Sequence, residues 1–108
     1  MFFWYNLFLY FYTMKILAIS TESENADWSN ETETLKAEAR QVFDLYLEGS
    51  LREIYFDEEV NAVLILECES INQAHELLNS LPLVKKRLIS FHARELNPYT
   101  GYERIMIV

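Results

Sequence analysis

The chain has 108 residues, 51% of them hydrophobic, and a formal net charge of −8. This length fits one domain with a real core. The acidic balance argues against nucleic acid and anionic membrane surfaces as partners, because both require clustered Lys and Arg. Cys68 is the only cysteine, so no intrachain disulfide exists. It follows an apolar run, and we therefore expect a buried structural thiol.

The first thirteen residues differ in composition from the rest of the chain. Eight of the sixteen aromatic residues lie within the first twelve positions. The stretch lacks the basic start and small-residue end of a signal peptide, and it is too short to span a membrane. We interpret residues 1–13 as an upstream extension outside the core, with Met14 as the physiological initiator. A hydrophobic arm that packs on a partner or membrane, and a cleaved or spanning segment, are the alternatives. Residues 14–108 then form a single domain, expected in the cytoplasm.

The first half of this domain predicts a strand followed by a helix. Lys15–Ser20 is short, apolar and compatible with a strand. After an acidic loop, Asn30 with Glu33 three residues later predicts a helix start, and Gly49 predicts the helix end. Within the helix, apolar residues recur at helical spacing: Leu35, Ala39, Val42, Phe43 and Tyr46.

The second half predicts a hairpin, a helix and a last strand. Leu51–Phe56 and Asn61–Cys68 are predicted strands joined by a charged turn. A capping pair that begins at Ser70 predicts the start of the second helix. Pro82 is predicted to end that helix, and Leu88–Leu96 forms the last predicted strand.

This order of elements predicts an α+β fold, the ferredoxin-like βαββαβ sandwich. In it, a four-stranded antiparallel sheet carries two helices on one face. Residues 62–66 are apolar on both sides of their strand, and a strand of that kind is buried on both faces. A second copy of the sheet is the simplest cover for the open face. We therefore expect a homodimer or a higher homo-oligomer.

Four short motifs follow Met14: Leu35-Lys36-Ala37-Glu38, Glu48-Gly49 with Arg52, Ala74 with Leu77 and Leu78, and Leu81-Pro82-Leu83. In their residues, order and spacing, these motifs resemble the muconolactone isomerase-like group of the dimeric α+β barrel superfamily. The segment 98–104 looks more like an uncharacterised bacterial subgroup. The resemblance implies pairing into a dimeric α+β barrel and an isomerase-like activity on a lactone or small carboxylate.

Three candidate site residues follow from this resemblance. Lactone isomerisation needs a base for the proton and a donor or cation for the developing oxyanion. The resemblance implies Glu38 as the base and Arg52 as its catalytic partner, with Lys36 as an alternative cation. Apart from the resemblance, Tyr55 and His92 are also expected to bind the ligand. His92 shares a face of the last strand with Arg94, and such a pair suits a small anion-binding cavity. Structural roles compete with these: Glu38 on an amphipathic helix is ordinarily solvated, and His92 suits a sheet edge or dimer rim.

Arg52 is expected to share a strand face with Ile54 and Phe56. There a guanidinium is either a rim residue or an anion site. No metal or cofactor is expected, because the sequence has neither a metal-ligand spacing nor a phosphate-cradling glycine loop. Two functions remain open. One is a small-molecule enzyme or binding protein with a pocket between helix and sheet, for a lactone or small anion. The other is a non-catalytic dimeric assembly module with no ligand.

Overall fold

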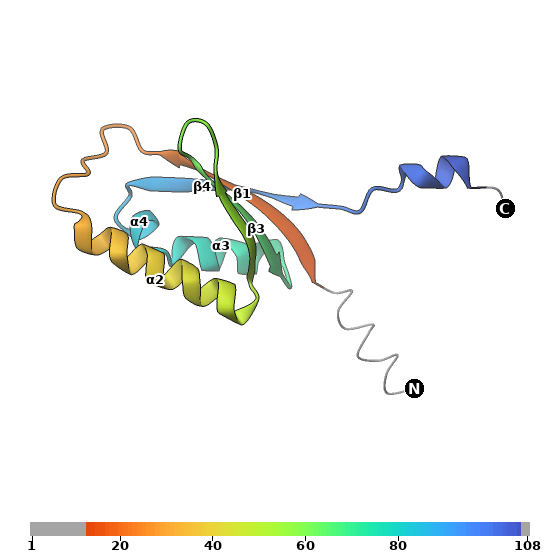
Figure 1. Ribbon diagram of the computed structural model, residues 1–108, viewed down its shortest axis with the longest axis horizontal. Helices are drawn as coiled ribbons and strands as arrows, with labels where there is room; N and C mark the ends of the chain where they lie inside the picture. Colours follow the sequence, from red (N-terminus) through yellow and green to blue (C-terminus); the bar gives the residue numbers. More distant parts are fainter. Residues whose placement is uncertain (1–12, 107–108) are drawn as a thin grey trace.

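The structure, a computed structural model, describes residues 13–106, so the expectations for residues 1–12 and 107–108 lie outside the described part. The elements are β1 (Met14–Glu22), α2 (Thr32–Glu48), β2 (Leu51–Phe56), β3 (Ala62–Cys68), α3 (Ile71–Asn79), α4 (Pro82–Lys85), β4 (Ile89–Leu96) and a 3-10 helix (Gly101–Ile105). The antiparallel sheet has the order β2-β3-β1-β4. The helices α2, α3 and α4 lie on one side of it (Figure 1). The predicted ferredoxin-like fold is confirmed.

Strand alternation gives the sheet one packed face and one open face. On β1, Ile16 and Ala18 are fully buried and lie opposite Leu66 and Leu64 of β3. The core also contains the buried residues Ala74 and Leu78 of α3. Cys68, Leu81 and Leu51 belong to the same buried cluster. The predicted burial of Cys68 is confirmed, and burial raises the pKa of its thiol.

The helix ends match the sequence prediction in part. Gly49 ends α2 in the left-handed conformation, with φ of 92°, as predicted. The prediction of a helix start at Asn30 is wrong, because Asn30 itself is left-handed and belongs to a turn. Ser70 caps α3, accepting a hydrogen bond from the Gln73 N–H at 3.0 Å. Pro82 does not end α3, which stops at Asn79, but opens α4, where a missing N–H costs nothing.

No helix among residues 13–106 combines the length and apolarity that crossing a bilayer demands.

A strained hairpin turn joins β2 to β3. The Asp57 carboxylate accepts hydrogen bonds from the Glu59 and Asn61 N–H groups, each at 2.9 Å, and so closes the turn. Val60 lies in this turn with φ of 62° and is 71% exposed. A β-branched residue at positive φ is a genuine outlier, because its Cβ crowds the following carbonyl. A glycine at position 60 would therefore make the turn more stable.

We expect Val60→Gly to raise the free energy of unfolding by about 1 kcal/mol, because glycine adopts positive φ without the steric penalty. Chemical denaturation of both proteins measures the difference. Glu58→Gly is the matched control, since Glu58 lies in the same turn at an ordinary φ and gains nothing from glycine. A loss of stability in Val60→Gly would show that side-chain packing of Val60 outweighs the backbone strain.

Candidate functional site between helix and sheet

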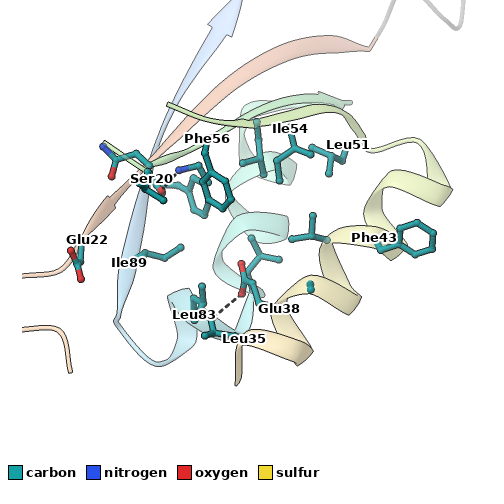
Figure 2. Close-up of a pocket in the computed structure, with 18 of the residues that line it drawn as sticks. Ser20, Glu22, Leu35, Glu38, Phe43, Leu51, Ile54, Phe56, Leu83 and Ile89 are labelled. Carbon is teal, nitrogen blue, oxygen red and sulfur yellow. Dashed lines mark hydrogen bonds between the residues drawn. The ribbon is translucent and has the colours of Figure 1, made fainter. Parts of the chain in front are cut away.

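A cavity of about 870 Å³ lies between α2 and the sheet. Figure 2 shows its walls, which come from α2, the strands and the short helix α4. Most of the lining is apolar and includes Leu35, Val42, Ile54, Phe56, Leu81 and Phe91. The volume falls within the range of roughly 300–1,000 Å³ that is usual for small-molecule sites.

The cavity exists because α2 does not close down on the sheet. Only Leu45 of this helix is buried, whereas Phe43 and Tyr46 are more than half exposed. The apolar stripe predicted from helical spacing therefore lines the cavity instead of filling the core. Phe56 and Val60 are exposed on the hairpin side of the same cavity. Apolar side chains thus border the cavity on both α2 and the hairpin.

Glu38 brings a carboxylate from α2 to this apolar wall. One of its oxygens, Oε1, accepts a hydrogen bond from the Leu83 N–H at 2.9 Å (Figure 2). Burial raises the pKa of Glu38 above its ordinary value, while the hydrogen bond from Leu83 opposes the shift. Glu38 is therefore not the fully solvated helix residue that amphipathic patterning favoured. It is a half-buried carboxylate with one oxygen anchored.

The remaining polar groups of the lining come mainly from the ends of β1 and the hairpin. Ser20 is 5% exposed, and its Oγ accepts a hydrogen bond from the Ala62 N–H at 2.8 Å. The Trp28 indole N–H donates to the Glu22 carboxylate. Glu59 and Asn61 also line the cavity, while none of its described lining residues is Lys, Arg or His. The site thus offers three carboxylates and no cationic side chain.

Arg52 lies on the other side of the sheet from this cavity. A β-bulge between Leu51 and Glu53 interrupts the alternation of β2. The Arg52 Nε lies 3.5 Å from Oε2 of Glu67, whose side chain is on the open face. The expectation that Arg52 shares a face with Ile54 and Phe56 is therefore wrong, because both of these line the cavity and Arg52 does not. The structure does not bring Arg52 and Glu38 together.

The other three predicted residues also lie outside the cavity lining. Lys36 is exposed on α2, where its Nζ lies 3.5 Å from Oε1 of Glu33. Tyr55 is on the open face, and its hydroxyl donates to a carboxylate oxygen of Glu53 at 2.7 Å. His92 occupies the edge strand β4, exposed and opposite Ile19. Whether any of them binds a ligand stays a prediction.

Sequence reasoning missed Ser20 and Trp28 as site residues. Ser20 follows Ile16 and Ala18 at a spacing of two, so strand alternation places all three on the packed face. Trp28 sits in the loop after β1 and gave no periodic signal. Within residues 13–106, no cluster of His, Cys, Asp and Glu is arranged to hold a metal ion.

No family model matches the sequence, and no curated protein matches it. Among solved structures, the chain is similar to 5-chloro-2-hydroxyhydroquinone dehydrochlorinase (TftG) from Burkholderia phenoliruptrix AC1100, solved in complex with 2,5-dihydroxybenzoquinone. The TM-score is 0.59 and the identity is 13%, and the match covers 80% of this chain and 97% of that one. The uncharacterized protein TM1266 from Thermotoga maritima matches with a TM-score of 0.45 at 12% identity, covering 79% of this chain and 99% of that one. At 13% identity the likeness to TftG shows the fold alone, and it agrees with the ferredoxin-like arrangement described above.

Proposed function

We propose that this chain binds a small, mostly apolar molecule in the cavity between α2 and the sheet, and that Glu38 exchanges a proton with it. The observation that carries the proposal is the half-buried Glu38 carboxylate on the wall of an apolar cavity of about 870 Å³. A titratable group with a raised pKa in a cleft is a marker of functional sites. An apolar pocket with a few polar groups is the usual form of a ligand site.

The reaction that this arrangement suits is a proton shift next to a carbonyl. Glu38 takes a proton from one atom of the ligand and returns it to another, so neither the charge nor the oxidation state of the ligand changes. A raised pKa makes Glu38 a stronger base than a solvated carboxylate. The Leu83 N–H holds one carboxylate oxygen in place, which leaves the other for the ligand.

Two further observations support a small-molecule role. The ferredoxin-like fold of TftG holds a small ring compound in its solved structure, and the motifs around Glu38 resemble the muconolactone isomerase-like group. The proposal keeps Glu38 from that resemblance. It omits Arg52 and Lys36 as oxyanion stabilisers, because neither lines the cavity. The Ser20 hydroxyl, which already accepts the Ala62 N–H, is the donor on the sheet side.

The test of the cavity is a bulky substitution that fills it. We expect Ala39→Trp to abolish binding of small lactones, ketones and phenols, because Ala39 lines the cavity. Ala37→Trp on the same helix is the matched control, since Ala37 is exposed and does not line it. Calorimetric titration measures both variants against the unmodified chain. Equal binding in Ala39→Trp and Ala37→Trp would place any ligand elsewhere, and no binding by the unmodified chain would refute the proposal.

The raised pKa of Glu38 also predicts how stability depends on pH. Because the folded state holds this proton more tightly than the unfolded state, stability falls as the pH rises above the ordinary carboxyl pKa of 4.5. Glu38→Gln removes this proton equilibrium. The free energy of unfolding of Glu38→Gln should therefore increase relative to that of wild type as the pH rises. Denaturant unfolding over a pH series measures the gap, with exposed Glu33→Gln as control. Parallel pH profiles for Glu38→Gln and wild type would contradict it.

A second proposal concerns the open face of the sheet, and an apolar stripe there favours it. Leu17 and Ile19 of β1 lie beside Ile65 and Val63 of β3. We propose that this stripe packs on a second copy of the chain to form a homodimer. Covering apolar surface is the driving force.

The edges of the open face complement each other in charge. Glu53 on the outer strand β2 lies in the same row as Ile65 and Leu17, and Arg94 ends that row on the opposite edge, β4. A two-fold axis parallel to the strands lays β2 of one copy over β4 of the other. With this axis, Glu53 of each copy faces Arg94 of the other copy, so the open face is complementary to itself in charge.

Val63→Asp should convert the dimer to a folded monomer, because a carboxylate in the apolar stripe cannot be desolvated without a partner. The packed face does not contain Val63 and should remain intact. Sedimentation of both proteins, with circular dichroism to confirm folding, measures the change. Glu58→Lys at the hairpin turn is the control. A dominant monomer for the unmodified chain at micromolar concentration, or a stable Val63→Asp dimer, would contradict this assembly.

A further inference from the structure

We propose that the cavity selects ligands without negative charge that offer one hydroxyl or N–H donor to Glu38. This inference rests on the proposed function, because it names the class of molecule that the same cavity takes. It differs from the sequence-based expectation of a small anion, which depended on Arg52 lying beside the pocket. The charges of the lining and the free acceptor on Glu38 carry it.

The charges around the cavity oppose an anion. Glu22, Glu38 and Glu59 line it, and no Lys, Arg or His does among its described lining residues. The chain as a whole has a formal net charge of −8, so its long-range field also repels anions. A bound carboxylate would lose water without gaining a cationic partner, and burying a charge unpaired is costly. The ligand therefore enters without negative charge.

The Glu38 carboxylate then decides which polar group the ligand carries. An ionised carboxylate only accepts hydrogen bonds, and it has room for several. The only partner that the described structure gives it is the Leu83 N–H on Oε1. Figure 2 shows this bond beside the cavity wall. A ligand that donates an O–H or N–H to the second oxygen forms a charge-assisted hydrogen bond in apolar surroundings, where such bonds are strong.

The rest of the ligand is apolar and suits a ring. Phe43, Tyr46, Phe56 and Phe91 line the cavity together with aliphatic side chains. Aromatic side chains give large apolar contact area and prefer edge-to-face or offset stacking with other rings. A fused-ring phenol therefore matches the lining in both parts, with its ring against the aromatic wall and its hydroxyl at Glu38.

Three probes with one ring system separate these contributions: 2-naphthol, 2-methoxynaphthalene and 2-naphthoate. The first donates a hydrogen bond, the second has no donor, and the third is an anion. Calorimetric titration at pH 7 measures each against the full chain. We expect 2-naphthol to bind at least about tenfold more tightly than either of the others, because it alone donates a hydrogen bond to the Glu38 carboxylate, and a hydrogen bond to a charged group is worth about that factor or more in affinity.

Variants at Glu38 assign the preference to its carboxylate. Glu38→Leu should bind 2-naphthol and 2-methoxynaphthalene equally, and Glu33→Leu on the exposed side of the same helix should behave as wild type. Because Glu38→Leu leaves the Leu83 N–H without its acceptor, Glu38→Gln serves as a second variant that keeps an amide oxygen there. It should bind 2-naphthoate more tightly than wild type does, because one repelling charge is gone.

The outcomes separate this inference from the proposed function. If 2-naphthoate binds wild type as tightly as 2-naphthol does, the cavity is a ligand site but the charge selection is refuted. If 2-methoxynaphthalene equals 2-naphthol in wild type, the donor to Glu38 is refuted. If Ala39→Trp leaves the binding of all three probes unchanged, they bind outside the cavity, and both the inference and the proposed function fail.

Discussion

The pairing of β1 with β3 is the constraint on which the rest of the structure depends. Its register sets Ile16 and Ala18 against Leu66 and Leu64 on one face, and Leu17 and Ile19 against Ile65 and Val63 on the other. A shift by one residue would exchange these two sets. The core, the floor of the cavity at Ser20 and the apolar stripe of the open face therefore all follow from one ladder of backbone hydrogen bonds.

The two sides of the helical layer use this sheet differently. α3 buries Ala74 and Leu78 and completes the core. α2 buries Leu45 alone, near its C-terminal end, and the rest of its apolar stripe borders the cavity. The hydrogen bond from the Leu83 N–H to Glu38 ties α2 to the chain around α4. Thus α3 contributes mainly to the core, whereas most of α2 borders the cavity.

Most of the fold could be predicted from the sequence. Binary patterning located both main helices and every strand of the sheet. Gly49 marked the end of α2, and Ser70 marked the start of α3. The site could be predicted less well. Alternation in β2 assumes an unbroken strand, whereas the bulge after Leu51 moves Arg52 to the face opposite Ile54. A bulge depends on how two strands meet, and neither strand carries that information alone.

The same distinction applies to Glu38. Its helical position was readable, but its burial depends on where residues 81–83 lie, which is far along the chain. Amphipathic spacing also identified the stripe on α2 without showing that it borders a space. The separation between a helix and a sheet is a tertiary quantity, and periodicity says only which side of the helix faces inward.

The contact between Trp28 and Glu22 has a consequence for how the cavity can be observed. Trp28 lines the cavity, and the only other tryptophan is Trp4, within the first thirteen residues. A chain that begins at Met14 therefore carries a single indole, and it sits at the cavity with its N–H on a carboxylate. The emission of that one fluorophore senses the polarity of its surroundings. The protein thus contains its own optical reporter for the exchange of water and ligand in this space.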